Sequence, residues 1–591
     1  MNLFADLRTT ILDALDQMAH RSSPAHSTIN LDPDTINNIV VEPPRNPAHG
    51  DMATNAAMIA ARLFKQKPAL LAEQLIALLQ GDPRIESIEI AGPGFINMTL
   101  RSKCWHDFLH AIFTRPDCLN PAPITDQEKI NIEYVSANPT GPLHLGHTRG
   151  AVFGDALANL LQACGWDVTR EYYVNDGGGQ IDTLVQSAAF RYREAAGINQ
   201  DHPGETFYPG DYLISLAKEL LEQQGDRFDP KENLSTDPAF RDHVVGAMLD
   251  LIRSDLASLA IHHDVFTHER NLIESGAVDE AFAELTRQNL IYTGILDAPK
   301  GKRPDEWEPT EQVLFKSTKF GDDTDRPLKK SDGSWTYFAS DIACHFDKFK
   351  RGFNQQINIF GADHAGYIKR LQSATRAVCD GQASLEILVC QTVRLIEQSV
   401  PVKMSKRAGR FVTLHDLTKA VGKDAIRFLM MMRRHDAPLD FDLDLARTTS
   451  RDNPVFYVQY AHARTWSLEQ SMRRQLGDRV FFGASAPDRA TLGLLDRESE
   501  FAIIRKLAEW VRMIEAAGRM REPHRIAYYL VELAGLFHHL WNSNDEAEDG
   551  RLIIPDNPKK SQARTALVLA VRMVLARGLD MLSIEPVQAL H

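Results

Sequence analysis

The sequence predicts an α/β protein with a parallel sheet at its centre, a small α+β unit before it and a helical unit after it. Three observations carry this prediction. Between about residues 124 and 414, strand-like apolar runs alternate with helix-like segments, which is typical of a parallel sheet covered by helices. The residues before about 120 mix both patterns, whereas those beyond about 422 keep helical spacing. The chain of 591 residues, 43% of them hydrophobic, is long enough for several cores.

Residues 1–120 are expected to form the α+β unit. Apolar residues recur at helical spacing over residues 51–64, and Asp51 is placed to cap that helix at its N-terminus. A short strand is expected within residues 88–100. The Pro-containing stretch at residues 120–123 then predicts a linker to the next domain.

Residues 121–421 are expected to hold the parallel sheet and the helices on its faces. The interval of about 190–310 is too long for a simple crossover, so we interpret it as a largely helical insertion. The predicted strands span residues 130–135, 167–173, 357–360 and 387–390, and the clearest helices span residues 149–164 and 367–378.

Residues 422–591 are expected to form an all-helical domain. Apolar side chains keep helical spacing over residues 495–514 and again over residues 526–540. Pro523 separates these two helices, because proline cannot continue a helix that reaches it.

Composition indicates a soluble cytoplasmic protein. No apolar run is long enough to span a membrane, and Asp6 and Arg8 interrupt the apolar N-terminus in a way that argues against a secretory signal. The six cysteines are scattered without a C-x-x-C pair, which favours a reducing compartment and argues against zinc. The net charge of −13 argues mildly against nucleic acid as the main partner, but charge alone does not decide this.

The segment ANPTGPLHLGH is the most informative motif of the chain. It follows the first predicted strand of the sheet and leads into a helix, so backbone N–H groups and the positive end of that helix are placed where a polyphosphate would bind. His144 and His147 are three residues apart and can face one ligand, and Gly146 leaves room for close approach. The motif consists of Ala137, Asn138, Pro139, Thr140, Gly141, Pro142, Leu143, His144, Leu145, Gly146 and His147.

A second motif, KMSKR, spans residues 403–407 and follows the last predicted strand of the sheet. Three cations in five residues offer mobile positive charge for a phosphoryl group in transit. Alone, the pentapeptide is equally well read as a solvated basic loop. Its pairing with HLGH, in this order and across an alternating α/β region, is the signature of class I aminoacyl-tRNA synthetases.

The wider sequence resembles arginyl-tRNA synthetases of bacterial type. The resemblance rests on the runs IEYVSANPTGPLHLGHTRGAVFGDALANLL, REYYVNDGGGQI, GADHAGYIKRL and NPVFYVQYAHAR, and on the N-terminal NPAHGDMATNAAMIAARL and IEIAGPGFINMTL. It implies an N-terminal domain that contacts the tRNA elbow, a Rossmann-type catalytic domain with an insertion, and an α-helical anticodon-binding domain. The domains are expected at residues 1–120, 121–421 and 422–591.

The resemblance implies an arginine–tRNA ligase reaction in two steps. The carboxylate of arginine attacks the α-phosphate of ATP, giving arginyl-adenylate and pyrophosphate, and the terminal adenosine of tRNA(Arg) then takes the arginyl group and releases AMP. Members of the family need bound tRNA even for the first step. ATP is expected to bring Mg²⁺, no zinc site is expected, and the protein is expected to be a monomer.

The resemblance also implies roles for residues of the two motifs. His144, His147, Lys403 and Lys406 would be catalytic, the histidines toward the ATP phosphates and the lysines toward the leaving pyrophosphate. The residues assigned to ATP are Pro142, Leu143, His144, Leu145, Gly146, His147, Met404, Ser405 and Lys406.

Arginine itself demands carboxylates, since a guanidinium pairs bidentately with Asp or Glu. Tyr337 and Asp341 lie four residues apart on one helical face, and by resemblance this pair contacts the substrate side chain. The residues assigned to arginine are Glu133, Ser136, Asn138, His144, Tyr337 and Asp341, with Glu269 and His364 as further candidates. The loop Gly177–Gly179 is a weaker candidate for contact with an adenosine of either substrate.

Aromatic and charged residues in NPVFYVQYAHAR suit contact with anticodon bases, and Tyr457, Tyr460 and Arg464 are the candidates. Three alternatives remain open at this point. The first is another class I synthetase, for glutamate, cysteine or leucine, although a cysteine enzyme would want a zinc–thiolate site and a glutamate enzyme would want cations where Glu133 and Asp341 stand. An idle tRNA-binding protein is argued against by the intact histidines and lysines. A small adenylate-forming nucleotidyltransferase would not need the helical domain.

Overall fold

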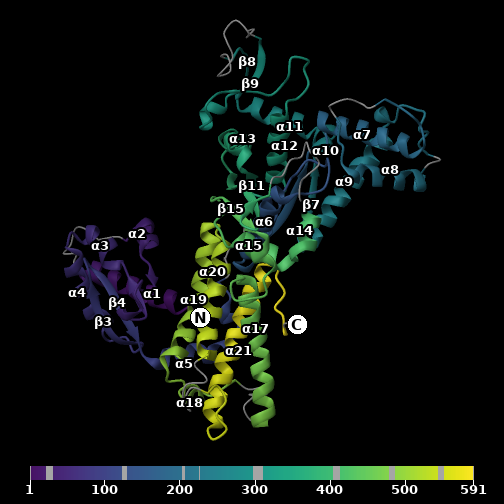
Figure 1. Ribbon diagram of the computed structural model, residues 1–591. Coiled ribbons are helices and arrows are strands. Elements are labelled where there is room, and N and C mark those ends of the chain that lie inside the picture. Colours follow the sequence, from purple (N-terminus) through teal and green to yellow (C-terminus); the bar gives the residue numbers. More distant parts are fainter. Residues whose placement is uncertain are drawn as a thin grey trace.

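Five parallel strands form the central sheet of the protein, which we describe from a computed structural model (Figure 1). Their order is β12-β11-β5-β6-β7, so the chain builds outward from β5 in one direction and then returns to add strands on its other side. The point of reversal, between β5 and β11, is where open α/β sheets bind their ligands. The strands are β5 (Lys129–Glu133), β6 (Asp167–Val174), β7 (Val265–His268), β11 (Gln355–Gly361) and β12 (Ser384–Cys390).

The structure describes residues 2–21, 31–122, 129–201, 207–224, 227–296, 310–402, 413–477, 486–542 and 551–589. Four of the strands confirm the four predicted from the sequence. Helix α6 (Leu145–Ala163) joins β5 to β6, and α12 (Tyr337–Lys350) leads into β11. Helix α13 (Ile368–Val378) joins β11 to β12 as predicted.

The expected insertion at about 190–310 is wrong in part. Helices α7 (Gly179–Ala195), α8 (Asp211–Gln224) and α9 (Pro238–Ser258) do make this region helical, but β7 lies inside it and belongs to the central sheet. A strand of four residues with one buried side chain gives almost no apolar signal in a sequence.

A separate unit follows β7 and precedes α12. It contains helices α10 (Glu269–Glu274) and α11 (Ala277–Arg287). Its three-stranded antiparallel sheet is formed by β8 (Ile291–Gly294), β9 (Gln312–Phe315) and β10 (Arg326–Pro327). This unit therefore extends beyond the interval that the sequence suggested.

The N-terminal domain is an α+β unit, as predicted, and stands apart from the central sheet in Figure 1. Its antiparallel sheet has the order β1-β2-β4-β3. The strands are β1 (Val41–Glu42), β2 (Met52–Thr54), β3 (Ile85–Ala91) and β4 (Phe95–Leu100). The helices are α1 (Leu3–Arg21), α2 (Pro33–Asn38), α3 (Ala56–Phe64), α4 (Pro68–Leu79) and α5 (Ser102–Thr114).

Two details of this domain differ from the prediction. Residues 51–64 are not one helix, because Met52–Thr54 pairs as β2 and the helix begins only at Ala56. Asp51 is not its cap; its carboxylate instead accepts a hydrogen bond of 2.7 Å from the Leu100 N–H. The expected single strand at 88–100 is a hairpin of β3 and β4, turned at residues 92–94.

The C-terminal region is a helical bundle, as predicted. It consists of α14 (Leu414–Val421), α15 (Lys423–Met431), α16 (Leu443–Arg447), α17 (Pro454–Leu476), α18 (Arg489–Leu492), α19 (Glu498–Met520), α20 (His524–Asn542) and α21 (Pro558–Met581). One strand departs from the all-helical expectation: β15 (Leu439–Asp442) pairs in parallel with β13 (Val393–Glu397), which also pairs with β14 (Val400–Pro401). None of the described helices is both long and apolar enough to cross a membrane.

A fully buried arginine joins the bundle to α6. Arg427 of α15 donates to the Asp155 carboxylate of α6 at 2.5 Å, to the Leu259 carbonyl at 2.8 Å and to the Leu582 carbonyl. Asn159, one turn further along α6, donates to the Met581 carbonyl at 3.0 Å. The end of α21 is therefore anchored to the helix that begins with the HLGH motif.

Close packing of α6 against the segment after β5 yields a stability prediction. A Cβ on Gly154 would lie 2.4 Å from Cγ and 2.7 Å from Cβ of Tyr134, which is itself fully buried. Gly154→Ala should therefore destabilise the protein by about 1–3 kcal/mol and lower its Tm. Gly246→Ala in α9 is the matched control, because nothing lies within 4 Å of its added Cβ. An equal Tm for the two variants would contradict this account of the α6 contact.

Candidate active site

A cavity of about 820 Å³ opens at the carboxyl edge of the sheet, at the point where the strand order reverses. The ends of β5, β6, β11 and β12 contribute to its walls, together with the first turn of α6 and one face of α12. All side chains predicted for the amino acid lie along it: Glu133, Ser136, Asn138, His144, Glu269, Tyr337, Asp341 and His364.

A sharp backbone turn after β5 aims the chain into the cavity. Val135 and Ser136 have φ values of 69° and 38°, which are unfavourable for residues with a side chain. The Ser136 hydroxyl donates to Oε1 of Glu133 at 3.1 Å and accepts from the Tyr173 N–H at 3.0 Å. These bonds hold the strained turn, so the functional segment starts from a fixed geometry.

His144 and His147 form the N-terminal cap of α6. The Gly146 N–H donates to Nδ1 of His144 at 3.1 Å, and the His144 N–H donates to Nδ1 of His147 at 3.4 Å. The two rings stack with centroids 3.8 Å apart. Because each Nδ1 accepts a backbone hydrogen bond, each neutral ring carries its proton on Nε2 and is a donor there. Two adjacent donors at a helix N-terminus suit phosphate oxygens.

Gly146 is required by His144. A Cβ at this position would lie 2.9 Å from Cε1 of the His144 ring, so any larger residue would displace that imidazole. The neighbouring leucines behave differently from the prediction. Leu143 and Leu145 are buried in the core, and Pro142 does not line the cavity. The side chains of Leu143 and Leu145 are therefore part of the core, and only their backbone is available to a nucleotide.

Asp341 and Glu269 supply negative charge to one wall of the cavity. The Tyr367 phenol donates to Oδ2 of Asp341. Burial, opposed by that hydrogen bond and reinforced by the charges of Glu133 and Glu269, raises the pKa of Asp341 to about 7. Burial also raises the pKa of Glu269, whose Oε2 has no hydrogen-bond partner among the described residues. The two carboxyls have no ion-pair partner in the described part of the chain, so a cation entering the cavity would find both available.

Two glycines of the loop after β6 lie close to Tyr337 and Glu269; we call the part of the cavity formed by Asp341 and Glu269 the acidic corner. A Cβ on Gly178 would lie 2.7 Å from the Tyr337 hydroxyl, and one on Gly177 would lie 3.1 Å from Oε2 of Glu269. Tyr337 remains 54% exposed at the start of α12. The glycine loop, which we expected near an adenosine, therefore packs against the residues predicted to hold arginine.

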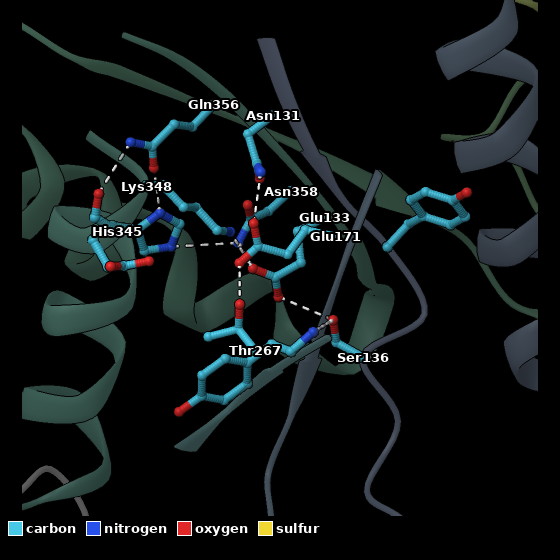
Figure 2. A network of polar contacts seen from close by, with 12 residues as sticks. Asn131, Glu133, Ser136, Glu171, Thr267, His345, Lys348, Gln356 and Asn358 are labelled. Carbon is cyan, nitrogen blue, oxygen red and sulfur yellow. Dashed lines mark hydrogen bonds and ion pairs between the residues drawn. The ribbon is translucent and has the colours of Figure 1, made fainter. Parts of the chain in front are cut away.

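A polar network adjoins the cavity, and three of its members, Glu133, His345 and Asn358, line the cavity itself (Figure 2). The Lys348 ammonium lies 2.5 Å from Oε2 of Glu133, and its side chain has no exposed area. Nδ1 of His345 donates to the Gln356 side-chain oxygen at 2.6 Å, and burial lowers the pKa of His345 to about 3, so its ring is neutral. The Asn358 amide donates to Oε2 of Glu133 at 3.4 Å.

The sequence reasoning missed this network and Tyr367. Lys348 lies seven residues beyond Asp341 and eleven beyond Tyr337, a spacing that places all three on one face of a helix. That spacing was a usable signal. His345, Gln356, Asn358 and Tyr367 had none, because their contacts join different elements and no local spacing predicts how those elements pack.

The KMSKR motif and its Lys403, Met404, Ser405 and Lys406 lie outside the described residues. Both flanks are described. Val402 donates its N–H to the Leu395 carbonyl at 2.9 Å, and Thr413 forms a β-bridge with His144. The Leu414 N–H donates to the Leu143 carbonyl at 2.8 Å. The segment after the motif is thus tied directly to the HLGH turn.

Tyr457, Tyr460 and Arg464 gather on one face of α17 with side chains of α20. The Arg464 guanidinium lies 4.2 Å from the ring centre of Tyr460 and 5.0 Å from that of Trp541. Tyr457 packs against His538 with ring centroids 4.5 Å apart. His462, in the same sequence run, is instead buried and bonds to the Val587 carbonyl. The cluster offers an aromatic and cationic surface on the first turns of α17.

Comparisons with known proteins agree with this architecture. The chain matches the family models for the arginyl tRNA synthetase N terminal domain at residues 5–100, the class I (R) tRNA synthetase catalytic domain at residues 114–439, and the DALR anticodon binding domain at residues 458–590. The R-type catalytic match leaves no place for the glutamate, cysteine or leucine alternatives.

Full-length relatives and solved structures give the same result. The chain is 49% identical over 593 residues to an arginine–tRNA ligase of Roseobacter denitrificans and 47% identical over 598 residues to one of Rhodospirillum rubrum, covering 100% of both chains in each case. The fold is similar to that of Thermus thermophilus arginyl-tRNA synthetase, with a TM-score of 0.71, 20% identity and full coverage of both chains. On the three family models and the relatives, the chain belongs to the class I arginyl-tRNA synthetase family.

Proposed function

We propose that this arginine–tRNA ligase activates arginine and transfers it to tRNA(Arg) within the cavity at the carboxyl edge of its central sheet. The observation that carries the proposal is the acidic corner formed by Asp341 and Glu269, which line the same cavity as the stacked imidazoles of His144 and His147. The acidic corner can bind a cationic side chain, and the imidazoles can bind a phosphate in the same cavity.

Arginine binds with its guanidinium at the acidic corner. Oδ1 of Asp341 accepts one N–H while Tyr367 holds Oδ2, and Glu269 accepts another. Tyr337 covers the guanidinium from the cavity lip. Glu133, Ser136, Asn138 and His364 are proposed to contact the α-end of the substrate, although Glu133 and Ser136 already bond to each other.

Activation joins the arginine carboxylate to the α-phosphate of ATP. A carboxylate oxygen forms a bond to the α-phosphorus as the bond to the bridging oxygen of pyrophosphate breaks. The Nε2–H groups of His144 and His147 donate to phosphate oxygens and stabilise the charge that accumulates there. Lys403 and Lys406 are proposed, on the family resemblance, to hold the leaving pyrophosphate.

Transfer then moves the arginyl group to tRNA. The terminal 2′-hydroxyl attacks the carbonyl carbon of arginyl-adenylate, the ester bond forms, and AMP leaves with the electron pair of the broken bond. ATP would bring Mg²⁺ on its own phosphates. In the described part of the chain, no group of three His, Cys, Asp or Glu side chains is arranged to hold a metal ion.

The tRNA is proposed to lie along the bundle, with its anticodon against Tyr457, Tyr460 and Arg464, and to reach the cavity with its acceptor end. The domains at residues 1–120, 121–421 and 422–591 would then contact elbow, acceptor end and anticodon. A monomer suffices for this arrangement, because one chain supplies every described wall of the cavity. Six free cysteines suit a reducing compartment such as the cytoplasm.

A requirement for tRNA tests the proposed mechanism. Exchange of pyrophosphate with ATP in the presence of arginine should appear only when tRNA(Arg) is added, because the family forms its adenylate only with tRNA bound. Radiolabelled pyrophosphate exchange with and without tRNA measures this. Exchange at full rate without tRNA would contradict the proposed tRNA requirement. Exchange with another amino acid in place of arginine would contradict the proposed substrate.

The pKa of Asp341 predicts a pH-dependent use of arginine. The carboxyl must be ionised to pair with the guanidinium, so the KM for arginine should fall by about tenfold as the pH rises from 6 to 8. Asp341→Asn should abolish this dependence and weaken arginine use by about 2 kcal/mol or more. The KM for ATP, measured in the same aminoacylation assays, serves as the control. A pH profile unchanged by the substitution would exclude Asp341 from the pocket.

Contact with the anticodon predicts a selective effect of Arg464. Arg464→Ala should raise the KM for tRNA(Arg) by about tenfold, the scale of a stacked cationic contact, and leave the KM values for arginine and ATP unchanged. Arg287→Ala, which removes an exposed arginine of α11, is the control. A rise of all three KM values would indicate a structural defect instead.

A further inference from the structure

The three carboxyls that line the cavity from buried or half-buried side chains, Glu133, Glu269 and Asp341, do not have equal surroundings. Glu133 alone has an ion-pair partner, the ammonium of Lys348 at 2.5 Å. A fourth acid, Asp363, has a side chain 81% exposed and is screened by water. Among the described residues, no lysine or arginine lines the cavity itself. Lys348 is therefore a buried cation that pairs with one of the three acids of this wall.

The position of Lys348 excludes direct contact with the substrate. Its side chain has no exposed area and does not line the cavity, so it cannot touch arginine in this arrangement. Glu133, by contrast, lines the cavity while Lys348 holds one of its oxygens from behind (Figure 2). Lys348 therefore acts on the substrate by holding the Glu133 carboxylate and through its own buried charge, and not by direct contact.

The ion pair between Lys348 and Glu133 affects the net charge that the cavity presents to arginine. Bound arginine carries two positive charges, one on the guanidinium and one on the α-ammonium. When all three carboxyls are ionised, they and Lys348 together carry two net negative charges, which match the two cationic groups of arginine. Burial by itself disfavours the charged amine, but Glu133 and Glu171 outweigh it and raise the pKa of Lys348 above its ordinary value. Lys348 is therefore charged when the cavity is empty.

We propose that Lys348 is a positioning residue for arginine recognition, which holds the carboxylate of Glu133 in place and sets the net charge of the cavity wall. Lys348, Asp341 and Tyr337 share one face of α12, so the same ion pair also fixes the helix that carries the guanidinium contacts against the end of β5. The inference rests on the proposed binding of arginine in this cavity.

The proposal predicts that loss of Lys348 changes the KM for arginine in opposite directions, depending on whether Glu133 is present. Lys348→Met alone leaves the Glu133 carboxylate without its cation, and the KM for arginine should rise by about tenfold or more. Glu133→Gln alone leaves a buried cation facing a cationic substrate, and the KM should rise further. Adding Lys348→Met to Glu133→Gln removes that cation, so the same substitution should now lower the KM by about tenfold. The KM for ATP should stay within about twofold throughout.

Aminoacylation kinetics of the wild type, both single variants and the double variant test this prediction, with Tm as a measure of folding. Lys348→Met carries the greatest risk of misfolding, because it leaves an unpaired buried carboxylate. The comparison of the double variant with Glu133→Gln avoids that variant and tests the same claim. A KM for arginine that rises on loss of Lys348 in both backgrounds, or does not change in either, would overturn the proposal.

Arg351→Met is the matched control. Arg351 ends the same helix and pairs at 2.7 Å with Glu171, which is fully buried but does not line the cavity. This variant should lower the Tm and leave the KM for arginine unchanged. Failure of the proposed function would appear differently, as an Asp341→Asn enzyme that uses arginine as well as the wild type does.

Discussion

The arrangement of the whole active site depends on the burial of α6. Most of the 19 residues of this helix are buried, and its polar side chains are anchored at successive turns. Arg149 donates to the carbonyls of Gln391 at 3.0 Å and Ala437 at 2.7 Å, which connects α6 to the end of β12 and to the segment before β15. Asp155 receives the buried Arg427 of the bundle. Because the first turn of this helix carries His144 and His147, the two imidazoles proposed to bind phosphate are held in place by the core.

A second constraint is the cost of burying charge. Asp341 and Glu269 sit in the cavity without ion-pair partners among the described residues, which is unfavourable for the protein alone. Glu133 differs, since Lys348, Ser136 and Asn358 all bond to it. The cavity thus combines one ion-paired acid with two acids that have no ion-pair partner among the described residues. These two acids make a guanidinium a favourable occupant, because its planar N–H groups supply positive charge and further hydrogen-bond donors.

Much of the fold could be predicted from the sequence, whereas the strands β7 and β2, which are very short, were missed. The middle strands β5 (KINIE) and β11 (QQINIFG) each carry two isoleucines at the two-residue spacing of a strand, and they were predicted within a few residues. Strand β7 was missed because four residues at the sheet edge carry little apolar character. The segment containing β2 was mistaken for part of α3, because three residues cannot show a period that distinguishes strand from helix.

The sequence by itself determined the class of chemistry and the family, because HLGH and KMSKR each place their functional groups within a few consecutive residues. It also determined that Tyr337 and Asp341 share a helix face, since helical spacing is a local property. Only the tertiary structure decided which partner each charge has. Lys348 reaches Glu133 across 215 residues of chain, and Tyr367 reaches Asp341 from a different element. Such contacts depend on how the helices dock on the sheet, and no local pattern encodes them.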